Sequence, residues 1–177
     1  LSVKYSFPMW LCEKWIDEFG YDFTEKLIES FGMEKRLNIR PNRLKITADE
    51  LCKKFNDNGI NAEVYDGYIA YDGYYTIQDS AAMQTAKVLA PCEGDTVIDM
   101  CAAPGGKTTH IAELMNNKGK IYAFDVHEHK IELIKKNAKR LGITIIEPKL
   151  SDGCKIDESM INTADKILCD VPCSGLG

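Results

Sequence analysis

The sequence predicts an α/β protein in which a small α+β unit precedes a doubly wound sheet of parallel strands. Up to residue 78, short apolar runs are separated by turn pairs such as Asp66-Gly67 and Asp72-Gly73, which are typical of hairpins. From Asp79 onward, strand-like and helix-like runs alternate, which favours parallel strands joined by helices. The composition, with 45% hydrophobic and 28% charged residues among 177, is that of a globular protein.

In the first part of the chain, helical spacing and end signals predict two helices. The first follows Pro8 and stops at Gly20, and the second begins at the capping-box pair Asp22 and Glu25 and stops at Gly32. A third helix begins at another capping box, Thr47 to Glu50. Extended runs are expected at residues 37–40, 61–65, 68–71 and 74–77.

In the second part, Ser80 can cap a helix through Leu89, which Pro91 follows. Strands are then expected at residues 96–100, 120–124, 143–146 and 165–170, with helices at 107–115 and 127–141. The sheet would end after its fourth strand, so we expect it to be C-terminally incomplete. The expected segments are a helical linker over residues 1–33, the small α+β domain over 34–78 and the sheet domain over 79–177.

Charge is unevenly distributed along the chain. The 22 Lys and Arg against 27 Asp and Glu give a net charge of −5, which by itself disfavours a nucleic-acid partner. Between Lys35 and Lys54, however, there are seven basic and two acidic residues, which give a local charge of 7 − 2 = +5. This segment is either a solvated face or a contact for phosphates.

The seven cysteines are scattered without C-x-x-C spacing, and the three histidines form no metal-ligand pattern with them. We therefore expect no disulfide framework and no metal, and a reducing, cytoplasmic location. No run of about 18 apolar residues occurs, so no membrane span is expected. No signal-peptide pattern opens the chain.

The stretch from Asp99 to Thr109 follows the first strand of the expected sheet and leads into a helix. Its small residues let a ligand approach the backbone closely. Gly106-Lys107-Thr108 matches the end of a Walker A loop, but Cys101 occupies the first Gly position of that pattern. The G-x-G-x-x-G pattern fails as well, because Gly105 and Gly106 are adjacent. A ligand with an adenosyl part and no pyrophosphate remains.

Three carboxylates come at the ends of the following strands. Asp125 lies about 20 residues beyond the loop, the distance at which an acidic residue binds ribose hydroxyls. Asp152 follows the third strand and Asp170 ends the fourth. Each of them alone could be a turn former or a helix cap. Their placement at consecutive strand ends predicts that they face one crevice together with the loop.

Two motifs carry a resemblance to a known family. Cys101 to His110 (CAAPGGKTTH) and Asp170 to Ser174 (DVPCS) together resemble the Sun (Fmu, RsmB-type) family of RNA cytosine-C5 methyltransferases. Ile77 to Ala81 is similar to the segment before the family's first Rossmann helix, and Arg40 to Arg43 to its R-x-N-R element. The resemblance implies a Rossmann-like methyltransferase sheet preceded by an RRM-like domain.

The resemblance also implies S-adenosylmethionine as cofactor and methylation of C5 of a cytidine in small-subunit (16S) ribosomal RNA. Asp125 would bind ribose, Asp152 would contact the adenine region, and Asp170 would lie near the cofactor and the target base. The cofactor loop would consist of Cys101, Ala102, Ala103, Pro104, Gly105, Gly106 and Lys107. RNA would be contacted by Arg36, Arg40, Asn42, Arg43 and Lys45.

The chemistry needs a thiolate that adds to C6 of cytosine so that C5 can attack the methyl group. Position alone favours Cys173, which follows Pro172 just beyond a strand end. The resemblance instead assigns the attack to a Thr-Cys motif and gives the Pro-Cys thiol a role in product release. No Cys of this sequence follows a Thr, so we expect cofactor binding without turnover. A non-catalytic RNA-binding protein with the same fold is the alternative.

Overall fold

The computed structural model describes residues 1–31, 38–60, 62–64, 74–153, 155 and 158–171. Its contacts divide the chain into two compact units, Leu1–Leu37 and Asn38–Gly177. Residues on both sides of the expected boundary at residue 78 belong to the second unit, and the three-part division of the chain remains a prediction.

The first unit is helical. It contains α1 (Ser2–Tyr5), α2 (Met9–Phe19) and α3 (Tyr21–Phe31), so both expected helices are confirmed and the short α1 is an addition. The rings of Phe7, Trp15 and Phe31 lie 5.6 to 6.2 Å apart between centroids. These aromatic contacts, together with buried side chains on α2 and α3, hold the helices against each other.

The second unit begins with a two-stranded antiparallel sheet of β1 (Ile39–Pro41) and β2 (Tyr75–Ile77). Between these strands in the sequence lies α4 (Ala48–Asp57), whose capping box of Thr47 and Glu50 is present as expected. Leu51 and Phe55 of this helix are buried in a small core. Residues 62–64 lie in no strand, contrary to expectation. The run expected at 68–71 lies outside the described residues.

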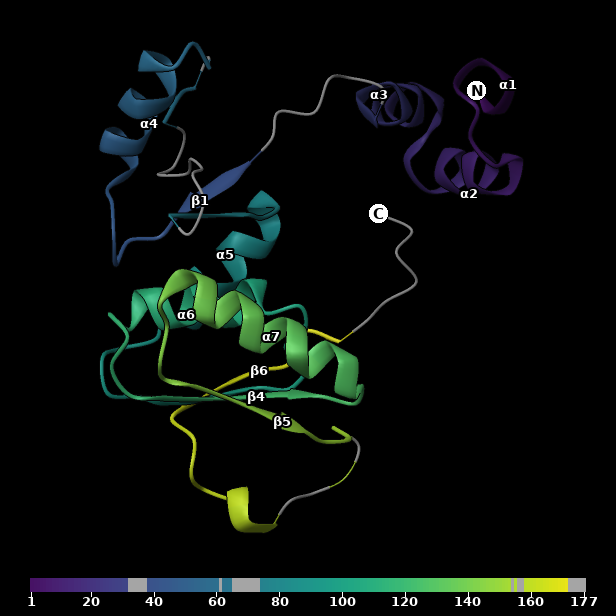
Figure 1. Ribbon diagram of the computed structural model, residues 1–177. Helices are drawn as coiled ribbons and strands as arrows, with labels where there is room; N and C mark the ends of the chain where they lie inside the picture. Colours follow the sequence, from purple (N-terminus) through teal and green to yellow (C-terminus); the bar gives the residue numbers. More distant parts are fainter. Residues whose placement is uncertain (32–37, 61, 65–73, 154, 156–157, 172–177) are drawn as a thin grey trace. The chain divides into compact units, whose positions relative to one another are not determined.

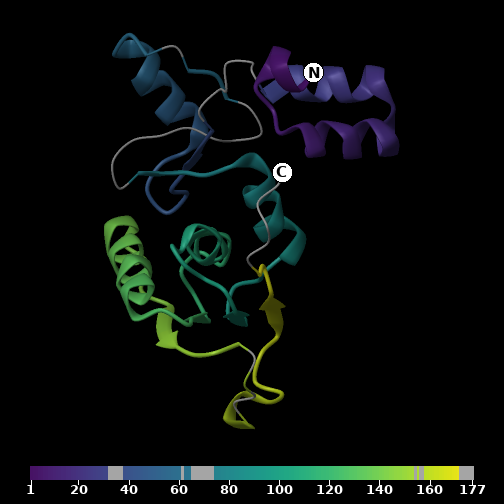
Figure 2. The same ribbon diagram turned by 90° about the vertical axis from the view of Figure 1, so that its right-hand side faces the viewer.

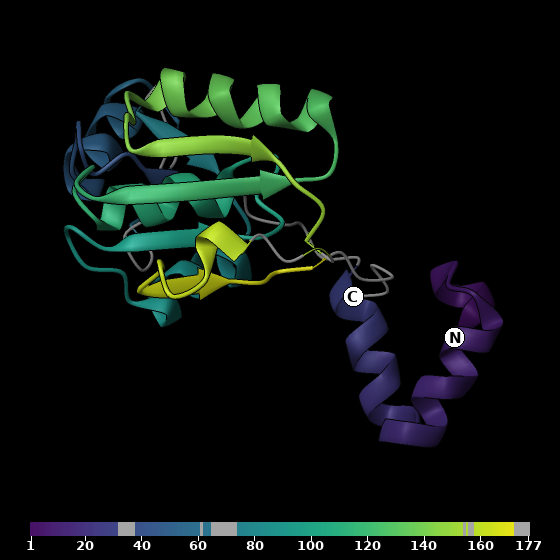
Figure 3. The ribbon, with the colours of Figure 1, turned by 90° about the horizontal axis from the view of Figure 1, so that it is seen from below.

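The main sheet has four parallel strands in the order β5-β4-β3-β6 (Figure 3). The strands are β3 (Thr96–Asp99), β4 (Lys120–Asp125), β5 (Ile146–Leu150) and β6 (Lys166–Leu168). A short 3-10 turn, η1 (Glu158–Met160), lies between β5 and β6 in the sequence. The predicted class, a parallel α/β sheet preceded by a small α+β unit, is therefore confirmed.

Three helices cover one face of this sheet: α5 (Ser80–Leu89), α6 (Gly106–Leu114) and α7 (Glu128–Leu141) (Figure 2). Their apolar side chains meet those of the strands in one buried cluster, made of Ala86, Val97, Ile111, Ala112, Met115, Ile121, Ala138, Leu141, Ile143 and Leu168. At about 25 cal/mol per Å² of apolar surface, burial of this cluster is the main force that fixes the helices on the sheet. No helix among the described residues is long and apolar enough to cross a membrane.

Two local expectations were wrong. The third strand is Ile146–Leu150 rather than 143–146, because Ile143 is a loop residue that fills the core at 6% exposure. Pro148 is accommodated in β5 because the strand lies at the edge of the sheet. The N-cap of α5 is Asp79 rather than Ser80, since the Asp79 carboxylate accepts hydrogen bonds from the amides of the first helical turn.

Candidate functional site

The carboxyl ends of β3, β4 and β6 form the candidate site. The chain leaves β3 through α6, which is labelled in Figure 1, toward β4 on one side, and β6 lies on the other side of β3 (Figure 3). The strand order therefore changes direction between β3 and β6. In open parallel sheets, ligands bind outside the carboxyl ends of the strands at such a point.

The loop after β3 is fastened to both neighbouring strands. The amide of Met100 donates to the carbonyl of Leu168, the last residue of β6, at 2.9 Å, and the amide of Ala102 donates to the carbonyl of Phe124 in β4 at 2.8 Å. The loop then turns on a bond of 2.7 Å from the Gly105 amide to the Ala102 carbonyl. These bonds give the loop a defined shape at the switch point.

Gly105 is required by the shape of this turn. Its φ of +101° is one that L side chains rarely adopt, and a Cβ there would lie 3.4 Å from the Cα of Ile134 in α7. The side-chain amide of Asn137 also donates to the carbonyl of Pro104 at 2.8 Å. The loop therefore packs closely on α7, and α6 begins directly after it.

The three carboxylates predicted from the sequence lie at successive strand ends. Asp125 is the last residue of β4 and is 7% exposed; its carboxylate accepts from the His127 amide at 3.1 Å. Asp152 follows β5 and is half-buried. Asp170 follows β6, is exposed, and forms an ion pair with Lys107 of α6. This ion pair connects the two sides of the switch point.

A further carboxylate, Asp99, was missed by the sequence analysis. It is the last residue of β3, is 1% exposed, and accepts a hydrogen bond of 2.7 Å from the Thr108 hydroxyl. Burial raises the pKa of Asp99 to about 6, against the opposing effect of that hydrogen bond. The feature of the sequence that could have identified Asp99 is its position immediately before the loop.

Cys101 lies among these acidic groups. Burial raises the pKa of its thiol, and the nearby Cys169, Asp99, Asp125 and Asp170 raise it further. A thiol in negative surroundings stays protonated at neutral pH, so Cys101 is unsuited to nucleophilic attack. Cys173 lies outside the described residues.

The basic segment divides into buried and exposed side chains. Arg40 and Asn42 are 1% and 0% exposed, so the expectation that they contact RNA is wrong for this structure. Their side chains bind other parts of the protein, because β1 packs against the helices of the main sheet. Arg43 and Lys45 are exposed, and Arg36 lies outside the described residues.

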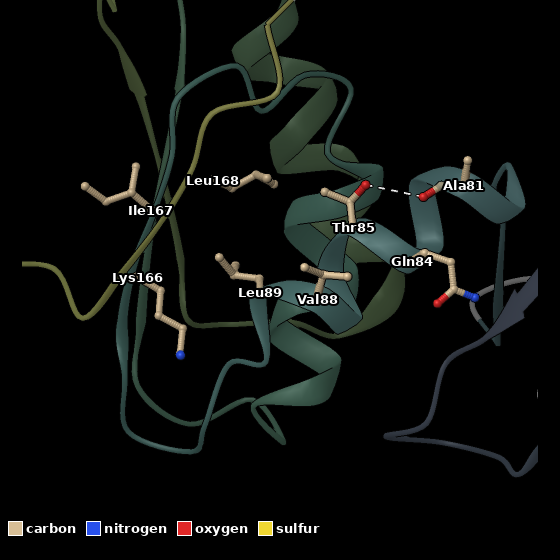
Figure 4. Close-up of a pocket in the computed structure, with 8 residues that line it drawn as sticks. All are labelled: Ala81, Gln84, Thr85, Val88, Leu89, Lys166, Ile167 and Leu168. Carbon is tan, nitrogen blue, oxygen red and sulfur yellow. Dashed lines mark hydrogen bonds between the residues drawn. The ribbon is translucent and has the colours of Figure 1, made fainter.

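A pocket of about 630 Å³ lies between α5 and β6 (Figure 4). Its lining consists of Ala81, Gln84, Thr85, Val88, Leu89, Lys166, Ile167 and Leu168. This lining contains no carboxylate that could accept hydrogen bonds from a ribose, so the carboxyl ends of the strands remain the stronger candidate site.

Comparison with known proteins gives the family. Residues 86–177 match the family described as "16S rRNA methyltransferase RsmB/F", and residues 7–68 match a "Methyltr_RsmF/B-like, ferredoxin-like domain". The "Probable ribosomal RNA small subunit methyltransferase B" of Bacillus subtilis is 39% identical over 193 residues, covering 100% of this chain and 43% of that protein. The chain thus spans less than half the length of this relative.

Two proteins of Pyrococcus horikoshii are also similar. The "tRNA (cytosine(72)-C(5))-methyltransferase" is 48% identical over 105 residues, which cover 59% of this chain and 27% of that protein. A solved structure described as a methyltransferase homologue superimposes with a TM-score of 0.83 at 29% identity, covering 98% of this chain and 62% of that chain. With the first family match extending over residues 86–177, more than half of its length, the chain belongs to the RsmB/F family of 16S rRNA methyltransferases.

Proposed function

We propose that the chain provides the cofactor site of an enzyme that methylates C5 of a cytidine in small-subunit ribosomal RNA, in the cytoplasm, with S-adenosylmethionine as methyl donor. One observation supports this proposal most strongly. The loop after β3, which is hydrogen-bonded to both neighbouring strands, lies beside carboxylates from the ends of β3, β4 and β6. The family relationship supplies the reaction class.

The residues at this edge fit S-adenosylmethionine. Asp125 offers carboxylate oxygens to the ribose hydroxyls, and Asp152 serves the adenine region. The loop from Cys101 to Lys107 has mostly small side chains, which leave room for the methionine part of the cofactor. When bound, the sulfonium of the cofactor supplies an electrophilic methyl group.

The acceptor side of the site would be formed by Asp170 and Cys173. In the family that the motifs resemble, a thiolate adds to C6 of cytosine, which makes C5 nucleophilic toward a methyl group. Loss of the C5 proton to a base and departure of the thiolate from C6 then restore the ring. The neutral thiol of Cys101 does not suit that attack. We assign Cys173 to product release, as the family pattern has it. The nucleophile would come from a Thr-Cys motif, which the printed sequence does not contain.

RNA would be contacted by the exposed basic residues around α4. Lys45 and Lys54 hold their ammonium groups 5.5 and 5.6 Å from the centroid of the Tyr74 ring, which is 39% exposed. An aromatic ring beside two cations suits a nucleic acid, because bases stack on aromatic faces and phosphates attract ammonium groups. We place Arg43 at the same surface.

Tritium transfer tests the reaction. The chain is incubated with methyl-tritiated S-adenosylmethionine and, separately, small-subunit rRNA, large-subunit rRNA and tRNA, and nucleosides are then analysed for 5-methylcytidine. We expect the chain alone to transfer no label. A chimera in which the chain replaces its matched part of the Bacillus subtilis relative should label small-subunit rRNA. Turnover by the chain alone that depends on Cys173 would contradict the assigned roles, and a folded chimera without activity would favour a non-catalytic RNA-binding protein.

A further inference from the structure

Arg40 of β1 extends along α6 inside the protein. Its guanidinium donates to the carbonyl of Gly106 at 2.8 Å and to the hydroxyl of Thr109 at 3.0 Å. It also forms an ion pair of 3.0 Å with the carboxylate of Glu113. A fourth bond reaches the side chain of Gln78, which follows β2. One side chain thus joins the small sheet to two successive turns of α6.

These acceptors fix the beginning of α6. Gly106, Thr109 and Glu113 lie on one side of the helix, at spacings of three and four residues. A planar guanidinium that binds all three restrains both rotation of the helix about its axis and sliding along it. Gly106 is the first residue of α6 and follows Gly105, where the loop turns, so the restraint acts directly on the candidate cofactor site.

Stability alone does not account for this arrangement. The side chains of Arg40 and Glu113 are 2% and 0% exposed, and removing both charges from water is costly. Replacing such a pair with apolar side chains of similar volume often leaves stability unchanged or increases it. What apolar side chains cannot provide is a set of directional bonds to the carbonyl of Gly106 and the hydroxyl of Thr109.

We propose that Arg40 is a positioning residue for cofactor binding. Its guanidinium, paired with the carboxylate of Glu113, holds the start of α6 and the preceding loop in the shape that receives S-adenosylmethionine. Arg40 does this without touching the cofactor. The inference rests on the proposed function, because it takes the loop from Cys101 to Lys107 to be the cofactor site.

Asn42 provides a matched control, because it lies two residues after Arg40 and directly follows β1. It is also fully buried and joins β1 to a helix of the main sheet, but its side-chain amide donates to the carbonyl of Leu141 at the end of α7. Asn42→Ala therefore weakens the contact of β1 with the sheet domain without loosening α6. A purely structural role of β1 would make Arg40 and Asn42 variants behave alike.

The test compares Arg40→Met, the double variant Arg40→Met/Glu113→Met, and Asn42→Ala in the 177-residue chain. The affinity for S-adenosylhomocysteine is measured by calorimetry, amide exchange by mass spectrometry and the unfolding midpoint in urea. We expect both Arg40 variants to bind about tenfold more weakly and to exchange faster over residues 101–109. Asn42→Ala should bind within about twofold of the wild type.

The double variant keeps the test decisive if Arg40→Met does not fold, because it leaves no buried charge unpaired. It should remain weak in binding even where its unfolding midpoint equals that of the wild type. Wild-type affinity in a stable double variant, or equal losses in the Asn42 and Arg40 variants at equal stability, would overturn the proposal. If the wild-type chain itself does not bind S-adenosylhomocysteine, the proposed function fails instead, and amide exchange over 101–109 still reports whether Arg40 holds the loop.

Discussion

Two ion pairs of α6 have the same kind of charges in opposite surroundings. At the start of the helix, Lys107 pairs with Asp170, with side chains 26% and 46% exposed. On the flank of the helix, Arg40 pairs with Glu113, with side chains 2% and 0% exposed. Water screens the first pair, so a ligand can displace it at little cost, whereas the second is fixed. The exposed pair can therefore change partners when a ligand binds, whereas the buried pair keeps α6 in place.

Breaking the buried pair should have the largest effect. Glu113→Ala leaves the guanidinium of Arg40 buried without its carboxylate, and an arginine cannot lose its charge by deprotonation. We expect a loss of about 3–5 kcal/mol in the free energy of unfolding, measured by urea denaturation. Arg40→Ala should cost less, because the remaining Glu113 can take up a proton: burial already raises its pKa to about 7. Equal costs for the two variants would contradict this explanation.

The same buried flank should make stability depend on pH through His110. Burial, together with the charges of Arg40, Lys87 and Arg43, lowers the pKa of this imidazole to about 3. Its contribution to stability is present above pH 6.5 and is lost as the pH falls toward 3, because only the unfolded chain takes up the proton. Relative to His110→Gln, the wild type should lose about 2 kcal/mol between pH 6.5 and 5.

This difference is measured by urea unfolding of the two proteins across the pH range. Asp99 acts in the opposite direction, since its raised pKa adds stability at low pH, but its contribution is common to both proteins and cancels. Parallel curves for the wild type and His110→Gln would show that the imidazole is not held neutral.

The loop can be compared with a turn of similar backbone shape elsewhere. Gly94 has a φ of +91° with open space around it, whereas a Cβ at Gly105 would contact the backbone of Ile134. Gly94→Ala should cost about 1–2 kcal/mol from backbone strain alone, and Gly105→Ala should cost more. Thermal unfolding measures the difference, and equal costs would show that the packing of the loop on α7 is loose.

The exposed ion pair should have the smallest effect on stability. Lys107→Ala is expected to change the free energy of unfolding by about 0–1 kcal/mol, because both partners are solvated. Urea denaturation beside Glu113→Ala measures the contrast directly. A loss comparable with that of Glu113→Ala would mean that α6 does not have the two distinct ion pairs described above.

The sequence was sufficient to predict those parts of the molecule whose structure is determined by local patterns of residues. Strand and helix alternation predicted the order of elements, and the loop after β3 together with Asp125 could be located because ligands bind at the carboxyl ends of parallel strands. Arg40 and Asn42 could not be assigned correctly, since a count of charges does not say which side chains face inward. Ile143 was misplaced for a similar reason, because an apolar residue can fill a core from a loop as well as from a strand.

The most direct test of the cofactor site is the affinity of the chain for S-adenosylmethionine, measured by calorimetry with Asp125→Ala and Asp165→Ala. Asp125 lies at the carboxyl ends of the strands, whereas Asp165 accepts from the amide of Thr96 at the amino end of β3. We predict that the wild type and Asp165→Ala bind the cofactor and that Asp125→Ala, while folded, does not. Undiminished binding by Asp125→Ala, or loss of binding in a folded Asp165→Ala, would contradict a cofactor site at the carboxyl ends of the strands.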